Sequence, residues 1–217
     1  MEICRPWRNS FRYKLLMPTP YFDEIITKGV RAGQIPARTQ TARDWYRDTA
    51  QKVSRVRNQN TMIKSDPERK MTAPMPGSMY LFNYDPKWAE ELPYYDRFPL
   101  IFPYKKIKGG FYGLNLHYLP LQLRGRLMDG LYELTNNTRY DETTKLKMSY
   151  EMLKGAEKLR FFKPCIKQYL DSHVRSQFMY IYPSEWDIAL FLPTESFAKK
   201  SKSQVWADSK RMLGVRR

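Results

Sequence analysis

Side chains that could carry out acid–base or metal chemistry are few in this sequence. It contains two histidines, His117 and His173, and two cysteines, Cys4 and Cys165, which lie far apart and form no CxxC pair. The HExxH and GxSxG patterns are also absent, so neither a zinc protease nor an α/β-hydrolase site is indicated. We therefore expect no cofactor, no structural metal and no disulfide, and we interpret the protein as a non-enzyme in a reducing, intracellular setting.

A small metal-dependent nuclease is the enzymatic alternative. Such enzymes gather several carboxylates around a divalent cation, usually with a lysine nearby. Acidic residues occur at this density in any domain, so the nuclease hypothesis is weaker than a binding function. The candidates for such a cluster are Asp85, Asp96, Asp129, Asp141, Glu142 and Lys145.

The segment KKIKGGFYGLNLHYLP, residues 105–120, combines lysines and glycines as phosphate-binding loops do. A P-loop needs GxxxxGK[ST] before a helix, and this segment has neither. Apolar residues instead alternate with small or polar ones, which is typical of a half-buried strand. Residues 108–110 predict the turn of a β-hairpin whose first strand covers 98–107. Asn115 and His117 are then expected on the outer face, where a lone histidine is usually a surface residue rather than a catalyst.

The positive charge is concentrated at the two ends of the chain. Lys and Arg number 38 against 22 Asp and Glu, a formal net charge of +16. Residues 1–76 hold 15 basic against 7 acidic residues and residues 199–217 hold 7 against 1, whereas residues 77–198 are nearly neutral. Basic arms on a neutral body indicate a polyanionic partner, because each Lys or Arg placed on a phosphate releases a condensed counterion. Such arms equally suit docking on acidic proteins, so charge alone does not distinguish a nucleic-acid partner from a protein partner.

The N-terminal arm, residues 1–76, is predicted to contain one amphipathic helix at 41–57. Its first forty residues are expected to be extended, with at most one short helix near 21–29. We expect the arginines of the 41–57 helix to stand off its apolar stripe, so that the helix docks on the core with solvated arginines or also contacts nucleic acid. Residues 58–76 contain three prolines and no periodicity, and they predict a linker. The apolar stripe consists of Trp45, Thr49, Val53 and Val56.

The core is predicted to cover residues 77–198, with strands at 78–85 and 177–183 joining the hairpin. A helical insertion covers about 120–175. One helix starts at Pro120, a second occupies about 142–160, and a third follows Pro164 and ends near His173. Residues 184–193 fit either a short helix or a last strand. We expect an α+β fold built on a small antiparallel SH3-like β-barrel with this helical insertion, flanked by basic N- and C-terminal arms, and an unclassified α+β arrangement is the alternative.

Tyr94 and Tyr95 precede Arg97 in the segment LPYYDRFP. Tyrosine rings and arginine planes stack on exposed bases in proteins that bind single strands. Tyrosines in a proline-rich loop also pack on the core, and packing is the favoured interpretation here. Elsewhere no segment is apolar and long enough to predict a membrane helix, and arginines occupy the N-terminus where a secretion signal would need an apolar run.

Several motifs recur in the order found in one group of virion proteins: MYLFNYDP, LPYYDRFPLIFP, GGFYGLNLHYLP, TKLKMSYEML, FFKPCIKQYL, EWDIALFLP and VWADS. Over about residues 77–210 they resemble the DNA end-protector or head-completion family of contractile-tailed, T-even-like phages. The resemblance implies a non-enzymatic protein that binds the termini of packaged linear DNA, or the portal region, and blocks host exonucleases when DNA enters a cell. It carries over no catalytic residue.

Our first hypothesis is therefore a virion protein that occludes double-stranded DNA ends. The expected protein partners are the portal, neck or other virion proteins or a second copy of the chain, with no membrane contact, and the expected locations are the virion and the host cytoplasm during assembly and after the DNA enters a cell. A head-completion, neck, tail or baseplate assembly protein without DNA contact is the alternative. The predicted phosphate contacts are Arg38, Arg43, Arg47, Arg55, Arg57, Lys105, Lys106, Lys108, Lys199, Lys200, Lys202, Arg216 and Arg217.

Overall fold

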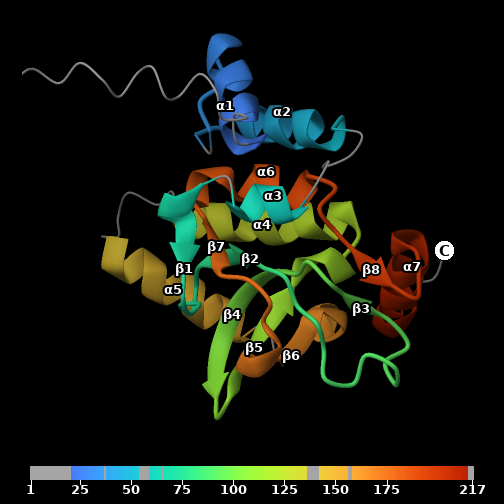
Figure 1. Ribbon diagram of the computed structural model, residues 1–217. Helices are drawn as coiled ribbons and strands as arrows, with labels where there is room; N and C mark the ends of the chain where they lie inside the picture. Colours follow the sequence, from blue (N-terminus) through green and yellow to red (C-terminus); the bar gives the residue numbers. More distant parts are fainter. Residues whose placement is uncertain are drawn as a thin grey trace, which may run out of the picture.

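The computed structural model describes residues 21–36, 38–53, 59–64, 66–135, 142–155 and 158–214. These residues form a mixed α+β fold, as expected (Figure 1). The helices are α1 (Tyr21–Arg31), α2 (Gln40–Gln51), α3 (Gln59–Lys64), α4 (Leu121–Thr135), α5 (Glu142–Gly155), α6 (Trp186–Phe191) and α7 (Lys202–Leu213). The strands are β1 (Lys70–Met71), β2 (Met79–Leu81), β3 (Tyr95–Asp96), β4 (Leu100–Ile107), β5 (Gly110–Asn115), β6 (Ile166–Leu170), β7 (Phe178–Ile181) and β8 (Phe197–Ala198), and short 3-10 turns link several of them.

Six strands form one antiparallel sheet in the order β1-β7-β2-β4-β5-β6, while β3 pairs with β8 separately. The described strands thus leave two free edges, β1 and β6, and the closed SH3-like barrel is not found among them. The sheet is nevertheless curled, because Tyr84, just beyond β2, forms an isolated bridge with Val174, just beyond β6. Arg175 N adds a 2.8 Å hydrogen bond to Asn83 O at the same place.

The predicted hairpin is confirmed as β4 and β5, which pair from Ile101–Asn115 down to Ile107–Gly110. Gly109 supplies the left-handed residue of the turn, with φ of 74°. Gly110 serves a different purpose, since a Cβ there would lie 2.1 Å from the carbonyl oxygen of Tyr169 on β6. Only glycine therefore lets β6 pair this closely with β5 at the end of the hairpin.

The sheet buries both faces. Alternate residues, such as Leu81 and Phe102, face the main core under the helices. Their neighbours face the other way and form a second group, here called the aromatic cluster, in which ring centroids of Phe82 and Phe178 lie 4.8 Å apart. The aromatic cluster consists of Tyr80, Phe82, Tyr84, Ile101, Phe111, Tyr169 and Phe178.

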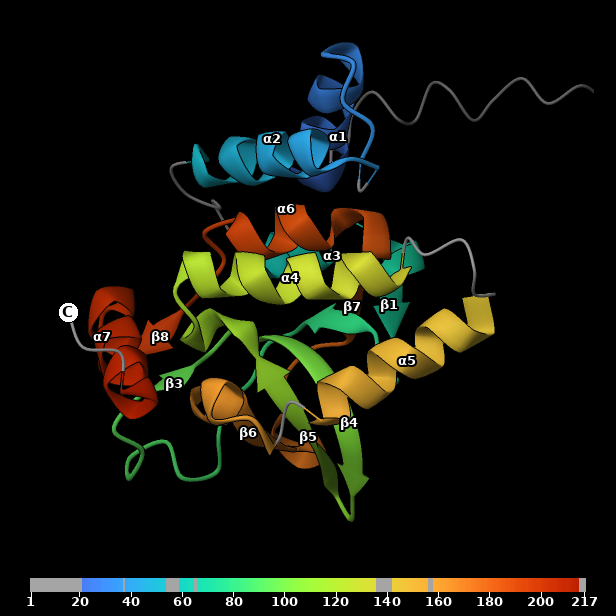
Figure 2. The ribbon, with the colours of Figure 1, turned by 180° about the vertical axis from the view of Figure 1, so that it is seen from behind.

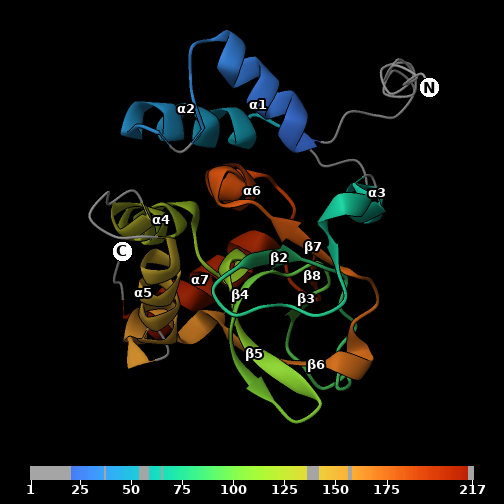
Figure 3. The same cartoon turned by 90° about the vertical axis from the view of Figure 1, so that its left-hand side faces the viewer.

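The helices are arranged in layers over one end of the sheet. Helices α4 and α6 lie next to the sheet, and α1 and α2 form an outer layer beyond α6 (Figures 2 and 3). The β4–β5 hairpin projects at the opposite end of the molecule from α1 and α2 (Figure 3). In the part of the chain that is described, no helix has the length and apolar character that crossing a bilayer requires.

The predicted linker at 58–76 is wrong where the structure describes it. Met62 and Ile63 of α3 are buried at 2% and 4% exposure, and β1 pairs with β7. The burial of Met62 and Ile63 and the pairing of β1 with β7 attach this segment to the core, although its prolines predicted an extended linker. The core therefore begins before Gly77. The helix expected at 21–29 is confirmed as α1, and the one starting at Pro120 is confirmed as α4.

The third predicted helix, after Pro164, is also wrong. A 3-10 turn occupies Arg160–Cys165, and the chain then continues as β6, which pairs with β5 from Leu114–Ile166 to Gly110–Leu170. His173 lies in a 3-10 turn, where its Nδ1 is 2.8 Å from the carbonyl oxygen of Asp85. The ladder with β5 supplies long-range hydrogen bonds that a local helical pattern cannot reveal.

The C-terminal region is more ordered than a basic tail. The ambiguous segment 184–193 contains the helix α6, with all six residues buried. Beyond it, α7 starts at a capping box formed by Ser201 and Gln204 and ends at Gly214, whose φ is 68°. Val205 at 0% exposure anchors α7, so the described core extends well past residue 198.

Candidate nucleic-acid interface

A groove of about 720 Å³ runs along the β4–β5 hairpin. The loop at 72–76 and the segment at 174–178 form its other sides, and Phe111 and Phe178 of the aromatic cluster lie in its floor. Lys105, Lys106 and Arg175 also line it. The groove thus combines an apolar floor with cationic walls.

The lysines of the hairpin are free to meet an anion. Lys105 and Lys106 are exposed near the end of β4, and Lys108 is exposed in the turn. None of the three pairs with a carboxylate of another described residue. Among the described residues, the guanidinium of Arg175 is held only by an exposed pair with Asp85 at 3.3 Å, and Asp171 is the one acidic residue of these ranges that lines the groove. Unpaired ammonium groups on a rigid hairpin suit phosphate contacts, which position a duplex without reading its sequence.

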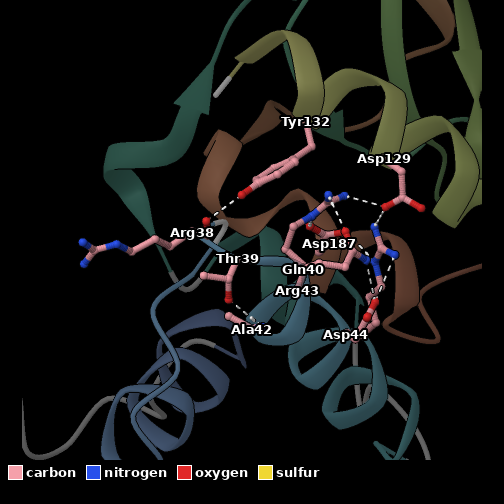
Figure 4. A network of polar contacts seen from close by, with 10 residues as sticks. Arg38, Thr39, Gln40, Ala42, Arg43, Asp44, Asp129, Tyr132 and Asp187 are labelled. Atoms are coloured by element: carbon pink, nitrogen blue, oxygen red, sulfur yellow. Dashed lines mark hydrogen bonds and ion pairs between the residues drawn. The ribbon is translucent and has the colours of Figure 1, made fainter. Parts of the chain in front are cut away.

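Two other predicted phosphate contacts lie in the protein interior. Arg43 and Arg47 of α2 are 1% and 7% exposed. Their Nε atoms donate to the two oxygens of Asp187 on α6, at 2.8 Å and 2.7 Å. Both guanidinium groups also reach Asp129 Oδ1 on α4, at 3.0 Å and 2.7 Å (Figure 4). The prediction for these two arginines is corrected, because they join α2 to the core.

The register of α2 explains this correction. The helix ends at Gln51 and buries Ala42, Tyr46 and Ala50 together with the two arginines, rather than the face of Trp45 and Thr49. Burial by itself would lower the pKa of Arg47, but the hydrogen bonds and charges of Asp129 and Asp187 outweigh it and raise the pKa. The carboxylates of Asp129 and Asp187, which come from distant parts of the chain, thus allow α2 to bury the face that carries its two arginines.

Apart from Lys199, the remaining predicted contacts fall into three groups. Arg38 is exposed, and its guanidinium points away from the network of α2, as Figure 4 shows. Lys200 pairs with Asp208 at 2.8 Å and Lys202 with Glu195 at 3.2 Å, so both are already partly neutralised. Four predictions lie outside the described residues, namely Arg55, Arg57, Arg216 and Arg217.

Lys199 has a role that its sequence position did not suggest. Its Nζ donates to the carbonyl oxygens of Ala89, Glu90 and Leu92, at 2.7, 2.6 and 3.0 Å. Its own φ is 66°, the left-handed region that non-glycine residues rarely adopt. The ammonium therefore closes the end of the 86–92 loop instead of standing free.

His117 lies in a buried polar group that sequence reasoning missed. Its Nδ1 is 2.6 Å from Asp96 Oδ2, and its Nε2 is 3.0 Å from Thr194 Oγ1. The expectation of an outward histidine is wrong, because β5 ends at Asn115 and the chain turns into a 3-10 helix. The side chain of Asn115, also expected outside, caps that turn at the backbone N–H of His117 and is 0% exposed.

This buried group has the order carboxylate, imidazole and hydroxyl that a hydrolase triad has. Asp96, His117 and Thr194 are however 3%, 0% and 0% exposed, so no substrate can approach the hydroxyl. Burial would raise the pKa of Asp96, but the charge and hydrogen bond of His117, with the bonds from Phe98 and Asn115, outweigh it and lower the pKa. The group is a structural one that ties together three segments of the chain.

A fully buried arginine, Arg124 of α4, completes this region. Its guanidinium donates to the carbonyl oxygens of Leu119, Leu190 and His117, at 2.8, 2.7 and 3.2 Å. Trp206 of α7 donates to the same His117 oxygen at 2.8 Å. Burial lowers the pKa of Arg124. Three backbone carbonyl groups thus hold this charge in the protein interior.

The candidate nuclease carboxylates are engaged separately. Asp85 pairs with Arg175, Asp96 with His117, and Asp129 with the arginines of α2. Asp141 and the side chains of Glu142 and Lys145 lie outside what the structure describes. Within the described ranges, no three His, Cys, Asp or Glu side chains are grouped so that they could hold a metal ion.

One comparison with known proteins gives a match over most of the chain. A family model described as Phage T4 terminal DNA protecting protein matches residues 22–211. The match begins in α1 and ends in α7, so it includes the outer helical layer, the sheet and the hairpin. No curated protein and no solved structure matches the chain.

Proposed function

Because the chain belongs to the phage T4 terminal DNA protecting protein family, we propose that it binds the ends of packaged linear double-stranded DNA and shields them from host exonuclease. The family supports the phage DNA end-protecting role. The match over residues 22–211 is the observation that carries the proposal. The groove along the hairpin supplies a physical site for it.

In this proposal the hairpin lysines hold DNA phosphates. Lys105, Lys106 and Lys108 are exposed and have no acidic partner among the described residues. Each ammonium placed on a phosphate releases a counterion, which gives binding that is independent of sequence and steeply dependent on salt. Arg38 is exposed too, but it precedes α2 at the opposite end of the molecule from the hairpin (Figure 3), so it is not part of this set. Arg43 and Arg47 are left out because the core uses them.

Protection here needs no chemistry by the protein. A bound protein covers the terminal phosphodiesters, so a processive exonuclease cannot thread the strand end. We propose a non-enzymatic protein of the virion that is present in the host cytoplasm during assembly and after the DNA enters a cell. Its protein partners in this proposal are portal or neck proteins, or a second copy of the chain.

An assembly protein without DNA contact is the second candidate, and one surface favours it. Val30 and Ile35 are 57% and 48% exposed at the end of α1, in the layer farthest from the hairpin (Figure 3). Exposed apolar side chains suit a protein partner. Salt separates the two candidates, because apolar docking does not weaken with salt as phosphate binding does.

Exonuclease protection tests the proposal. Linear duplex DNA is mixed with the full chain and challenged with a processive exonuclease over a series of salt concentrations, with closed circular DNA as the competitor. We expect the linear DNA to survive at low salt, the protection to fade as salt rises, and circles to compete poorly. The absence of both protection and salt-sensitive binding would favour the second candidate, an assembly protein without DNA contact. A parallel incubation with Mg²⁺ and no exonuclease checks that the protein itself leaves the DNA intact.

A further inference from the structure

A second cavity, of about 350 Å³, lies beside the first groove. Its lining includes the aromatic rings of Tyr84, Trp88, Tyr94, Tyr95, Tyr118 and Tyr169. Tyr84 and Tyr169 of the aromatic cluster form part of its wall, as Phe111 and Phe178 form part of the groove. The cavity and the groove are lined by consecutive residues of the chain, since Leu170 lines the cavity and Asp171 lines the groove. The second cavity is called the aromatic cavity below.

Trp88 stands at the aromatic cavity with 56% of its surface exposed. The other rings of the cavity are more buried, with Tyr118 and Tyr169 at 4% and 3% exposure. Lys87 Nζ lies 4.8 Å from the centroid of the Trp88 ring, so a cation accompanies the exposed aromatic face. A large ring left open to solvent next to a hollow of other rings is suited to stacking on a flat partner.

The loop that carries Trp88 is fixed rather than loose. Glu91 N and Leu92 N donate to the carbonyl oxygen of Trp88, at 3.1 and 3.0 Å. The three hydrogen bonds from Lys199 close the same loop from the other side. The backbone that carries Trp88 is therefore held in place before any ligand arrives, which lowers the entropy that binding must overcome.

A second cation lines the aromatic cavity without an acidic partner. Lys167 Nζ lies 4.0 Å from the ring centroid of Tyr118, and no carboxylate of the described residues forms an ion pair with it. Burial lowers the pKa of this ammonium. Asp96 also lines the cavity but is already bonded to His117, so an anion placed beside Lys167 would give this ammonium a partner of its own.

We propose that the aromatic cavity takes an unpaired nucleobase at the DNA terminus, stacked on Trp88, with its phosphate near Lys87 and Lys167. The proposal rests on the proposed function, since it assumes that the groove beside the cavity holds the duplex. Rings next to cations match a nucleotide, which has a flat base and a negative phosphate. The site accepts any base, because every base has a π-face, and it distinguishes a DNA end from internal duplex, where bases are paired and stacked.

An abasic comparison tests this inference with the phosphates unchanged. Labelled linear duplexes carry three unpaired thymidines at one end, on the 3′ or the 5′ strand in separate duplexes. Matched duplexes carry three abasic residues instead, and the affinity of the full chain for each is measured by fluorescence anisotropy. We expect the wild-type chain to bind one thymidine end roughly five- to a hundredfold more tightly than its abasic counterpart. Trp88→Ala should bind both about equally, and Trp88→Phe should restore most of the difference.

Tyr182→Ala is the matched control, because Tyr182 is an aromatic residue with 41% exposure that lies outside the aromatic cavity. It should keep the wild-type preference for thymidine. Equal wild-type affinity for thymidine and abasic ends, with linear DNA still preferred over circles, would overturn the base site and leave end protection standing. A wild-type chain that binds linear and circular DNA alike would overturn both proposals. Loss of the preference in Tyr182→Ala as well as in Trp88→Ala would also count against a specific site.

Discussion

Arg47 Nε donates to Asp187 Oδ1 over 2.7 Å and so joins α2 to α6 across 140 positions of the sequence. The second oxygen of the same carboxylate accepts from Arg43 Nε at 2.8 Å. Asp187 thus pairs with two arginines that are almost wholly buried, and Asp129 is the second carboxylate that balances their charge. The attachment of the outer helical layer to the core depends on the carboxylate of Asp187, since a buried cation without its partner is strongly destabilising.

Replacing Asp187 should therefore destabilise the protein more than loss of an ordinary ion pair would. We expect Asp187→Ala to lower the free energy of unfolding by about 3–5 kcal/mol, because two buried guanidinium groups lose their buried acceptor and keep mainly Asp129, whose side chain is 44% exposed. Urea denaturation followed by circular dichroism measures the effect. Asp44→Ala is the control, as this exposed carboxylate lies 3.4 Å from Arg47 and should cost less than about 1 kcal/mol. Similar losses in the two variants would show that Asp187 is not the main attachment.

The hairpin lysines should set much of the salt dependence of DNA binding. Removing three phosphate contacts with Lys105→Ala, Lys106→Ala and Lys108→Ala should reduce the log–log slope against salt by up to about 2.7, at about 0.9 per phosphate. Affinity for a linear duplex, titrated at several salt concentrations, gives the slope. A control removes three exposed charges from the opposite end of the molecule, with Arg31→Ala, Lys52→Ala and Lys64→Ala. An equal fall in both triple variants would mean that the interface is not confined to the hairpin.

Gly110 offers a test of the sheet that carries these lysines. A methyl group there would meet the carbonyl oxygen of Tyr169 at 2.1 Å, so β6 would have to move. We expect Gly110→Ala to lower the free energy of unfolding by about 1–3 kcal/mol, as overpacking in a core does. Gly155→Ala is matched to it, since no atom lies within 4 Å of a Cβ at that position. Gly155→Ala should change stability little, and a Gly110→Ala variant as stable as Gly155→Ala would contradict the close approach.

Local sequence patterns were sufficient for the hairpin and for the helix that starts at Pro120. In both, the signal lies within a few residues, such as the glycines of the turn or the proline at the first helical position. The pattern failed at β6, because its strand conformation depends on pairing with β5, some fifty residues earlier. Propensity is a weak guide where distant hydrogen bonds decide the structure.

The candidate site shows the same division. Lys105, Lys106 and Lys108 are exposed, because a hairpin end is exposed by its own geometry, and their contact with phosphates stays a prediction. Arg43 and Lys199 were expected at the surface because charge usually is, but each found an acceptor far away in the sequence, at Asp187 and in the 86–92 loop. A local sequence pattern does not reveal hydrogen-bond acceptors that lie far away in the chain. A basic residue can therefore be assigned to DNA binding or to the core only once the fold is known.

Cys165 should make the protein less stable in alkali. Burial raises the pKa of its thiol from 9.0 to about 12. The folded state therefore favours the neutral thiol, and this stabilisation is present below pH 9 and is lost as the pH rises towards 12. In a Cys4→Ser background, the free energy of unfolding should fall by about 1.4 kcal/mol more between pH 8 and pH 10 than it does when Cys165→Ala is added. Equal pH dependence with and without Cys165 would show that its thiol does not carry this effect.

Lys199 distinguishes a phosphate contact from a residue that positions a loop. If it held a phosphate, Lys199→Ala would lower the salt slope of DNA binding by about 0.9. The three carbonyl groups around its Nζ argue otherwise. We expect the slope to be unchanged, while the amides of Glu91 and Leu92, which bond to the carbonyl oxygen of Trp88, exchange hydrogen faster.

The preference for a thymidine end over an abasic end should fall with the same substitution, because Trp88 would no longer be held in place. Lys199→Gly relieves the strained φ of 66° and so separates the effect of the backbone from that of the ammonium. If the hydrogen bonds of Nζ matter, the glycine and alanine variants should lose the preference alike. A variant that lowers the slope and leaves the exchange of Glu91 and Leu92 unchanged would instead place Lys199 on the DNA, as its position in the basic C-terminal segment first predicted.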